Sequence, residues 1–321
     1  MITGLHHVTA ICGNAQDNLD FYVRVLGMRL VKRSVNQDDP STYHLFYADG
    51  AGHPGSDLTF FPWEHMPPGQ RGAGLTNAVD LAVPPDSLPY WAERLTRHGV
   101  RTTEPTIRFG ETVLSFTDPH GLGLALVETA DPRTFAAWSE GPVPALRQIR
   151  GLHGVRITER ALGATADFLT RGLGFEKTAE EDGWHRFSVA GGGSGRTIDV
   201  QEIPDASRGT WGVGSVHHVA FRVPDDDAEQ AARQQVLSAG RRPTEVIDRF
   251  WFKSVYFKEP GGALFEIATD GPGFSIDEDL ATLGEQLILP PFLEPHRAQI
   301  ERELSPLNMP RPSAIHDPDP A

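Results

Sequence analysis

Alternating and helical patterns of apolar residues follow one another along the chain. Residues 7–11 alternate in the way that a half-buried strand does. The next stretch carries apolar residues at i, i+3, i+4 and i+7: Leu19, Tyr22, Val23 and Leu26. This spacing predicts a helix, which Gly27 is placed to end. Further β-rich runs follow at residues 43–47 and 57–61, so the segment is predicted to have the order βαβββ.

The same pattern occurs three more times in the sequence. Residues 4–8 (GLHHV) resemble residues 151–155 (GLHGV), and the helical stretch that follows each of them matches at the same separation. A second pair of segments is related through Arg108-Phe109 and Arg249-Phe250. Such spacing indicates internal duplication, in which the third segment repeats the first and the fourth repeats the second. We therefore predict an α+β protein of four βαβββ modules.

These modules suggest a division of the chain into two domains and two connecting or terminal parts. The predicted ranges are 1–129 for modules one and two, 130–150 for a linker, 151–270 for modules three and four, and 271–321 for an extension. We expect a short helix in the linker around residues 134–138. The proline-rich extension contains one helix-like stretch, residues 295–304, and is expected to pack against the domains and then fray.

Charge and composition exclude several classes of function. The chain has 321 residues, with 29 Lys and Arg against 43 Asp and Glu, for a net charge of −14. This balance argues against nucleic acid and anionic membranes as partners. There is no apolar run long enough for a membrane span and no leader pattern, so we expect a cytoplasmic protein, for which a homo-oligomer remains open. Because Cys12 is the single cysteine, any metal must be held by histidines and carboxylates.

Three residues have side chains that can bind a metal, whereas the equivalent residues in the duplicated copies do not. His7 and His218 each end a His-His pair at the start of a predicted strand, and Glu266 lies within an apolar strand. Neighbouring strand residues point to opposite faces, so at most one histidine of each pair enters a site directly. Any one of these residues alone is more often a packed structural residue. Their counterparts, however, have side chains that cannot bind a metal: Gly154, Ala78 and Ala125.

Two histidines and one carboxylate suit Fe(II), because they occupy one face of an octahedral ion and leave three positions for substrate and O2. Mn(II) or Zn(II) would also be held by this set. The residues alone therefore predict a metal centre made of His7, His218 and Glu266, without fixing the metal.

Long motifs carry a resemblance to a known family. GLHHVTAI, SVHHVAFRV and GGALFEIATDGPGF resemble the vicinal oxygen chelate superfamily, and within it the ring-cleaving dioxygenases that act on hydroquinones. The resemblance implies two half-open β-barrels with helices outside, in which modules one and four share one barrel. It also implies that the second histidine of each pair and the late glutamate bind non-haem Fe(II), which corresponds to His7, His218 and Glu266.

The resemblance also implies catalytic and substrate-binding residues around the metal: Tyr256, His217, Arg249 and His6 as catalytic groups, and Thr9 at the substrate. We expect Arg249 to balance an oxyanion, Tyr256 to donate a hydrogen bond, and His6 or His217 to relay protons. Arg249 and His6 have identical counterparts in the duplicated copies, which leaves a shared structural role open for both, whereas Tyr256 and His217 do not. Trp251, close to Arg249, is expected to form a pocket wall.

These expectations lead to one main hypothesis and three alternatives. The main one is an Fe(II)-dependent extradiol-type dioxygenase that inserts both atoms of O2 into a hydroquinone-type ring. A catechol dioxygenase is the nearest alternative. A glyoxalase-type isomerase or transferase usually has a fourth protein ligand, and the equivalent position near Thr59 offers no carboxylate. A metal-free protein that binds aromatic compounds belongs to a different class, and the intact ligand set argues against it.

Overall fold

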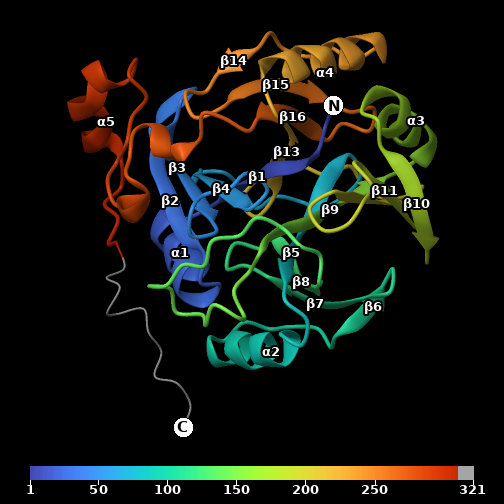
Figure 1. The fold of residues 1–321 in the computed structure, drawn as a ribbon, viewed down its shortest axis with the longest axis horizontal. Helices are drawn as coiled ribbons and strands as arrows, with labels where there is room; N and C mark the ends of the chain where they lie inside the picture. Colours follow the sequence, from blue (N-terminus) through green and yellow to red (C-terminus); the bar gives the residue numbers. More distant parts are fainter. Residues whose placement is uncertain (310–321) are drawn as a thin grey trace.

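Two eight-stranded sheets form the framework of the protein, and its α-helices lie on their outer sides (Figure 1). The structure is a computed structural model and describes residues 1–309. Module one contains β1 (Gly4–Cys12), α1 (Ala15–Asp20), the π-helical turn η1 (Phe21–Val25), β2 (Arg29–Asn36), β3 (Asp39–Ala48) and β4 (Asp57–Pro62). Module two contains β5 (Leu75–Val83), α2 (Leu88–Arg97), β6 (Thr106–Arg108), β7 (Glu111–Thr117) and β8 (Gly123–Glu128).

The second half of the chain repeats this order. Module three contains β9 (Gly151–Glu159), α3 (Leu162–Asp167), the π-helical turn η2 (Phe168–Gly172), β10 (Glu176–Glu181), β11 (Trp184–Ser188) and β12 (Thr197–Glu202). Module four contains β13 (Val216–Val223), α4 (Asp226–Ser238), β14 (Ile247–Asp248), β15 (Lys253–Lys258) and β16 (Leu264–Thr269). The predicted α+β fold of four βαβββ modules in two half-open barrels is confirmed.

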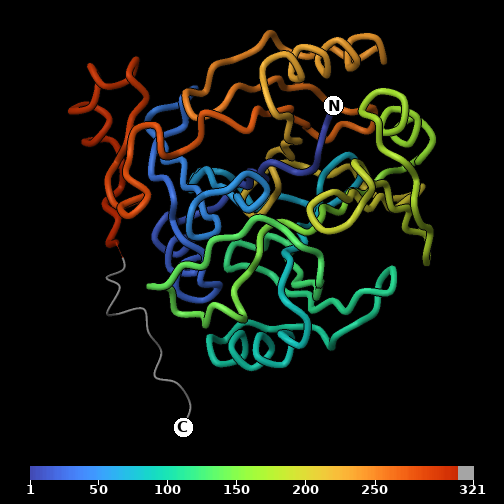
Figure 2. Tube along the Cα trace, viewed as in Figure 1, coloured from blue at the N-terminus to red at the C-terminus, as the bar shows by residue number. Residues whose placement is uncertain are grey.

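Each sheet combines modules from the two halves of the chain. The first sheet has the order β14-β15-β16-β13-β1-β4-β3-β2, and the second has the order β10-β11-β12-β9-β5-β8-β7-β6. Modules one and four thus share one sheet, as the family resemblance implied, and modules two and three share the other (Figure 2). Antiparallel pairing of β1 with β13 joins the first and last modules. The domain boundaries at residues 129, 150 and 270 remain a prediction.

The first helix begins and ends at residues whose chemistry explains its limits. The side chain of Asn14 accepts hydrogen bonds from the backbone N–H groups of Gln16 and Asp17, which caps α1. The helix continues through η1 to Gly27, whose φ of +67° is unfavourable for other residues and ends the helical path. The same π-helical turn recurs in module three as η2. The i, i+3, i+4 pattern predicted the helix but not this wider turn.

The predicted helix at residues 134–138 of the linker is wrong, because this segment has no regular secondary structure. Its backbone groups find partners in other parts of the chain. The N–H of Ala136 donates to Asp49, and the amide group of Gln148 bonds both the N–H and the carbonyl of Trp138. A segment of this length has little helical stability of its own, so these tertiary hydrogen bonds decide its path.

The extension packs against the outer edge of the first sheet, beside β2 and β3 (Figure 1). Its predicted helix is confirmed as α5 (Arg297–Glu303). Lys32 of β2 is completely buried under this extension and donates to Asp277 at 2.7 Å and to Glu278. The predicted fraying of the last residues lies outside the described part of the chain.

Within residues 1–309, none of the helices combines the length and the apolar character that crossing a membrane requires.

Two buried carboxyl groups meet where module three contacts module four. Glu159 ends β9 and is 3% exposed, and Glu259 follows β15 and is fully buried. Glu259 accepts hydrogen bonds from Thr165 and from the backbone of Gly262 and Ala263. Burial, and then the neighbouring charge of Glu259, raise the pKa of Glu159 to about 8. Glu159 is therefore largely protonated near neutral pH.

We expect Glu159→Gln to stabilise the protein increasingly as the pH rises. The folded-state pKa lies above the ordinary value of 4.5, so wild-type stability from this group is complete below pH 4.5 and is lost as the pH rises through 8. Glutamine mimics the protonated acid at every pH. Urea unfolding should show the advantage of the variant growing by about 2–3 kcal/mol between pH 6 and pH 9. Glu176→Gln, at an exposed site on β10, should show no such trend, and a pH-independent gain for Glu159→Gln would contradict the prediction.

Candidate metal centre

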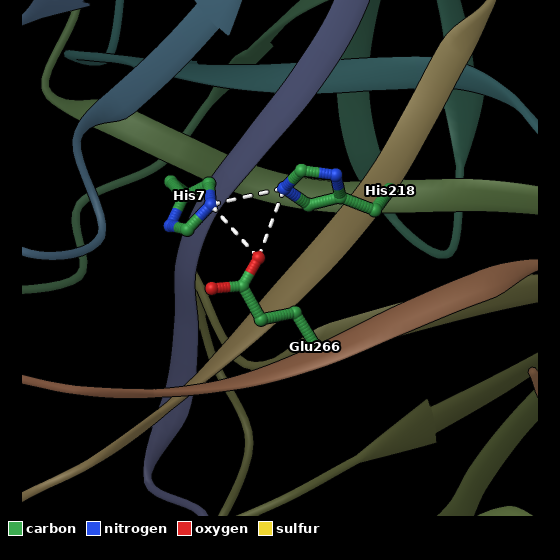
Figure 3. Close-up of side chains that lie close together, drawn as sticks. All are labelled: His7, His218 and Glu266. Atoms are coloured by element: carbon green, nitrogen blue, oxygen red, sulfur yellow. Dashed lines mark hydrogen bonds and ion pairs between the residues drawn. The ribbon is translucent and has the colours of Figure 1, made fainter. Parts of the chain in front are cut away.

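Three neighbouring strands bring the predicted metal ligands together in the first sheet. His7 comes from β1, His218 from β13 and Glu266 from β16. The two Nε2 atoms are 3.2 Å apart, and Glu266 Oε2 lies 3.3 Å from His7 Nε2 and 2.9 Å from His218 Nε2 (Figure 3). All three side chains are buried. The arrangement thus places two imidazole nitrogens and one carboxylate oxygen around a single point.

A β-bulge stands beside each ligand histidine. In the pairing of β1 with β13, Leu5 faces Phe221 and His7 faces Ala220, so His6 is an extra residue. His217 is likewise extra on β13, because Thr9 faces His218 and Ala10 faces Val216. Bulges redirect side chains. As a result, one ring of each pair reaches the centre, and the other ring contacts the first ring on the side away from the centre. The Nδ1 to Nδ1 distance is 2.9 Å for His6-His7 and 2.8 Å for His217-His218.

Hydrogen bonds fix the proton positions on the first pair. His6 Nε2 lies 3.1 Å from the backbone carbonyl of Thr269, which can only accept, so Nε2 carries the proton. Burial, and then the nearby His7, lower the pKa of His6 to about 3, so the ring is neutral and its Nδ1 accepts. His7 must then donate from Nδ1. Nε2, the atom of His7 that faces the centre, is thus the ring nitrogen left to bind a metal.

The second pair has a more open arrangement. Burial, and then the nearby His218, lower the pKa of His217 to about 3. The ring of His217 stacks on Trp211, with centroids 4.6 Å apart, and lies edge-on to Phe61. Its Nε2 has no hydrogen-bond partner within the described chain, in contrast to the Nε2 of His6. Of the two histidines predicted to relay protons, His217 is therefore the one whose outer nitrogen has no partner among residues 1–309.

Glu266 completes an arrangement of acceptors that fits a cation. Its Oε1 accepts a 2.5 Å hydrogen bond from Ser254, whereas the buried Oε2 has no hydrogen bond of acceptable geometry. Burial alone would raise the pKa of Glu266, but His7 and His218 hold it well below the ordinary value. A carboxylate oxygen and the imidazole lone pair of His7 thus converge beside a second imidazole nitrogen. This donor set suits Fe(II), Mn(II) or Zn(II).

A cavity beside the centre is lined by three of the residues predicted to be catalytic or to bind substrate. Arg249, Trp251 and Tyr256 line it together with His7 and His218. The Tyr256 ring lies edge-on to the His218 ring at 5.6 Å, and the Arg249 guanidinium lies 5.4 Å from the centre of the Tyr256 ring. Trp251 is almost completely buried and donates from Nε1 to Asp277 of the extension. These residues are therefore placed where a bound ring would contact them.

The turn that carries Arg249 is shared between duplicated modules, but the contacts of the arginine are not. Phe250 and its counterpart Phe109 both have positive φ angles, +73° and +51°, which are uncommon for such residues. Arg249 makes two hydrogen bonds to Asp38, whereas Arg108 pairs with Asp80 in the other sheet. The shared feature is thus the backbone turn, and the environment of Arg249 is particular to the sheet that holds the candidate metal ligands.

Thr9 does not line this cavity. It is fully buried, and its hydroxyl lies 2.8 Å from the hydroxyl of Thr59, which in turn lies 2.9 Å from His44 Nε2. Thr9 is connected to the cavity lining only through Thr59 and His44, and its contact with substrate stays a prediction. His44 and Ser254 are residues that the sequence reasoning missed. The alternation of His44 with Phe46 in a strand of module one was the available signal, because it places both side chains on one face.

The second sheet lacks ligands at the equivalent positions. Pairing of Asp80 with Ala125 repeats that of Ala220 with Glu266, which confirms that Ala125 occupies the place of the glutamate. Ion pairs occupy the interior of this sheet instead: Asp80 with Arg108 and Arg156, Asp199 with Arg186, and Glu111 with Arg186 and His153. One sheet therefore brings the three candidate metal ligands together, and the related sheet carries a charge network at the equivalent positions.

Known proteins resemble this chain over most of its length. The family model of the Glyoxalase/Bleomycin resistance protein/Dioxygenase superfamily matches residues 4–126 and 151–267. The "Putative ring-cleaving dioxygenase MhqO" of Bacillus subtilis is 42% identical over 306 residues, which cover 95% of this chain and 97% of that protein. The "Chlorohydroquinone/hydroquinone 1,2-dioxygenase" of Sphingobium indicum is 33% identical over 312 residues, covering 95% and 96%.

A solved structure is similar over almost the whole length. The crystal structure of a "putative dioxygenase" from Bacillus subtilis has a TM-score of 0.90 and 41% sequence identity, and the match covers 96% of this chain and 98% of that one. Fold, duplicated modules and relatives thus agree, and the chain belongs to the glyoxalase/bleomycin resistance protein/dioxygenase superfamily.

Proposed function

We propose that this protein is a ring-cleaving dioxygenase that uses Fe(II) to insert both atoms of O2 into a hydroquinone-type ring. The observation that carries the proposal is the convergence of His7, His218 and Glu266 without a fourth protein ligand among residues 1–309. Thr59 stands where a fourth ligand would be: it pairs with Thr9 as Glu266 pairs with Ala220. A glyoxalase-type centre with four protein ligands is therefore disfavoured.

The chemistry divides between the metal and the chain. When bound, Fe(II) supplies open coordination positions for a substrate hydroxyl and for O2, and it lets electrons pass from the ring to oxygen. Tyr256 supplies a hydrogen-bond donor, because burial, and then the charge of Glu266, raise the pKa of its hydroxyl and keep it protonated. Arg249, held by two hydrogen bonds to Asp38, supplies positive charge at the same cavity to balance a developing oxyanion.

The remaining groups in the cavity orient the ring and limit access of water. Aromatic side chains form much of its lining: Phe46, Phe61, Trp251 and Phe252. His217, with its free outer nitrogen, is suited to move a proton between the centre and its surroundings. The 33% identical relative named for chlorohydroquinone and hydroquinone supports this substrate class.

We expect the protein, loaded anaerobically with Fe(II), to consume O2 with hydroquinone or methylhydroquinone. Labelled O2 should place both of its atoms in a ring-opened product, as mass spectrometry can show. Faster turnover of catechol would favour the catechol alternative, and conversion of methylglyoxal with glutathione would favour the glyoxalase type. An absence of O2 uptake with every dihydroxybenzene would refute a dioxygenase function.

A further inference from the structure

His44 is a second histidine of module one at the metal-side cavity, and the ligand set does not use it. It lies on β3, is only part-buried, and lines the same cavity as His7 and His218. Its ring packs against Phe46 and Phe61, with centroid distances of 3.8 and 4.4 Å. A polar ring is thus held in a fixed place between two apolar walls of the substrate cavity.

The duplicated modules show that this position distinguishes the metal-containing sheet. Leu45 pairs with Phe60 as Val255 pairs with Ile267, so His44 in module one is equivalent to Ser254 in module four. Ser254 donates to Glu266, and His44 bonds Thr59, the residue in the place of Glu266. By the same pairing, the second sheet has an aliphatic and a large aromatic side chain at this position: Val113 and Trp184.

One ring nitrogen of His44 is engaged and the other is available. Nε2 is bonded to Thr59, whereas Nδ1 has no hydrogen bond to any residue between 1 and 309. Burial, and then the nearby His7 and His218, hold the pKa of His44 well below its ordinary value, so the ring is neutral. A neutral imidazole offers one N–H and one lone pair, which suits a hydroxyl group better than an anion.

Other polar groups of the cavity mouth already have protein partners. Gln37 donates to the carbonyl of Arg249, Asp38 accepts from the Arg249 guanidinium, and the Asn36 side chain accepts from the backbone of Asp38. They are therefore less free than His44 to bind a ligand inside the cavity.

Substrate geometry gives this free nitrogen a use. The two hydroxyls of a hydroquinone lie at opposite ends of the ring, so only one reaches the metal. Both hydroxyls of a catechol are adjacent and reach the metal together. A cavity that selects hydroquinones needs a partner for the far hydroxyl, because a buried hydroxyl without a hydrogen bond is costly.

We propose that His44 binds the hydroxyl of the aromatic substrate that does not reach the metal and thereby selects hydroquinones over catechols. This inference rests on the proposed function. His44 is then a specificity residue, and Thr59, with Thr9 behind it, orients its ring.

Anaerobic binding to the Fe(II)-loaded protein tests the inference without turnover. Dissociation constants are measured for hydroquinone, phenol and catechol with wild type, His44→Ala and His44→Gln. Wild type should bind hydroquinone about fivefold to tenfold more tightly than phenol, and His44→Ala should remove that difference while leaving phenol and catechol nearly unchanged. Trp184→Ala, at the equivalent strand position of the second sheet, is the control and should retain the wild-type preference for hydroquinone over phenol. Iron content and thermal melting establish that each variant is folded.

The outcomes separate this inference from the proposed function. Unchanged hydroquinone binding in His44→Ala, or an equal loss for all three ligands, would overturn the role of His44. His44→Gln retains polar atoms and provides the measurement if alanine disturbs the fold; equal changes for all three ligands would overturn the role here too. Failure of the wild-type protein to consume O2 with any dihydroxybenzene would instead refute the dioxygenase, whatever the binding constants show.

Discussion

His218→Ala should bind Fe(II) at least about 100-fold more weakly than the wild-type protein, and His7→Ala and Glu266→Ala should do the same. Each substitution removes one of three converging donor atoms and leaves two, which is too few to hold the ion against water. The loss should be seen by anaerobic titration with Fe(II) and by metal analysis after gel filtration.

A histidine of the second sheet provides the matched control. His153 is the counterpart of His6 and is equally buried, but it contacts Glu111 and Ser194 and lies outside the metal centre. His153→Ala should retain the wild-type iron content. If His218→Ala, correctly folded by its melting curve, still bound one equivalent of iron with wild-type affinity, the site assigned to His7, His218 and Glu266 would be wrong.

Tyr256→Phe should lower kcat by about 100-fold to 1000-fold while iron content and folding stay unchanged. Tyr256 pairs directly with Glu266 across the sheet, and its ring touches His218 and the Arg249 guanidinium. Phenylalanine keeps this ring packing and deletes only the hydroxyl. Because the hydroxyl is proposed to act as charge develops, the effect should fall on kcat more than on KM.

Removal of a tyrosine hydroxyl far from the cavity is the control for Tyr256→Phe, because it shows whether losing any tyrosine hydroxyl lowers kcat. Tyr43 donates its hydroxyl to the carbonyl of Ser305 in the extension, away from the cavity. Tyr43→Phe should therefore retain wild-type kcat. A kcat of Tyr256→Phe within threefold of wild type would remove the hydroxyl from the mechanism.

Much of this architecture is predictable because duplication is visible in the sequence. Loss of ligand chemistry at Gly154, Ala78 and Ala125 indicated three candidate ligands without any other protein for comparison, and the structure brings these three side chains together. The pairing of module one with module four was implied by family resemblance alone. Local patterns cannot show it, since sheet pairing between distant strands depends on edges and register that no short run of residues specifies.

Features that depend on irregular backbone or distant contacts could not be predicted. Alternation assumes a regular strand, so the bulges at His6 and His217, which bring both rings of each pair into contact, leave no mark in the pattern. The role proposed for His44 depends on Thr59 and on the walls of a cavity that only the pairing of modules one and four creates. A lysine in a strand is expected to be exposed, but Lys32 is buried because the C-terminal extension covers it and Asp277 accepts its hydrogen bond.

The sharing of one sheet between the first and last modules also has a consequence during synthesis. His7 leaves the ribosome early, but its partner His218 on β13 is made 211 residues later, and Glu266 on β16 later still, on the order of tens of seconds at typical elongation rates. In that interval the edge of β1 that will receive β13 is open to wrong partners. If His7, His218 and Glu266 hold the metal as proposed, the ion can be captured only after module four has emerged from the ribosome.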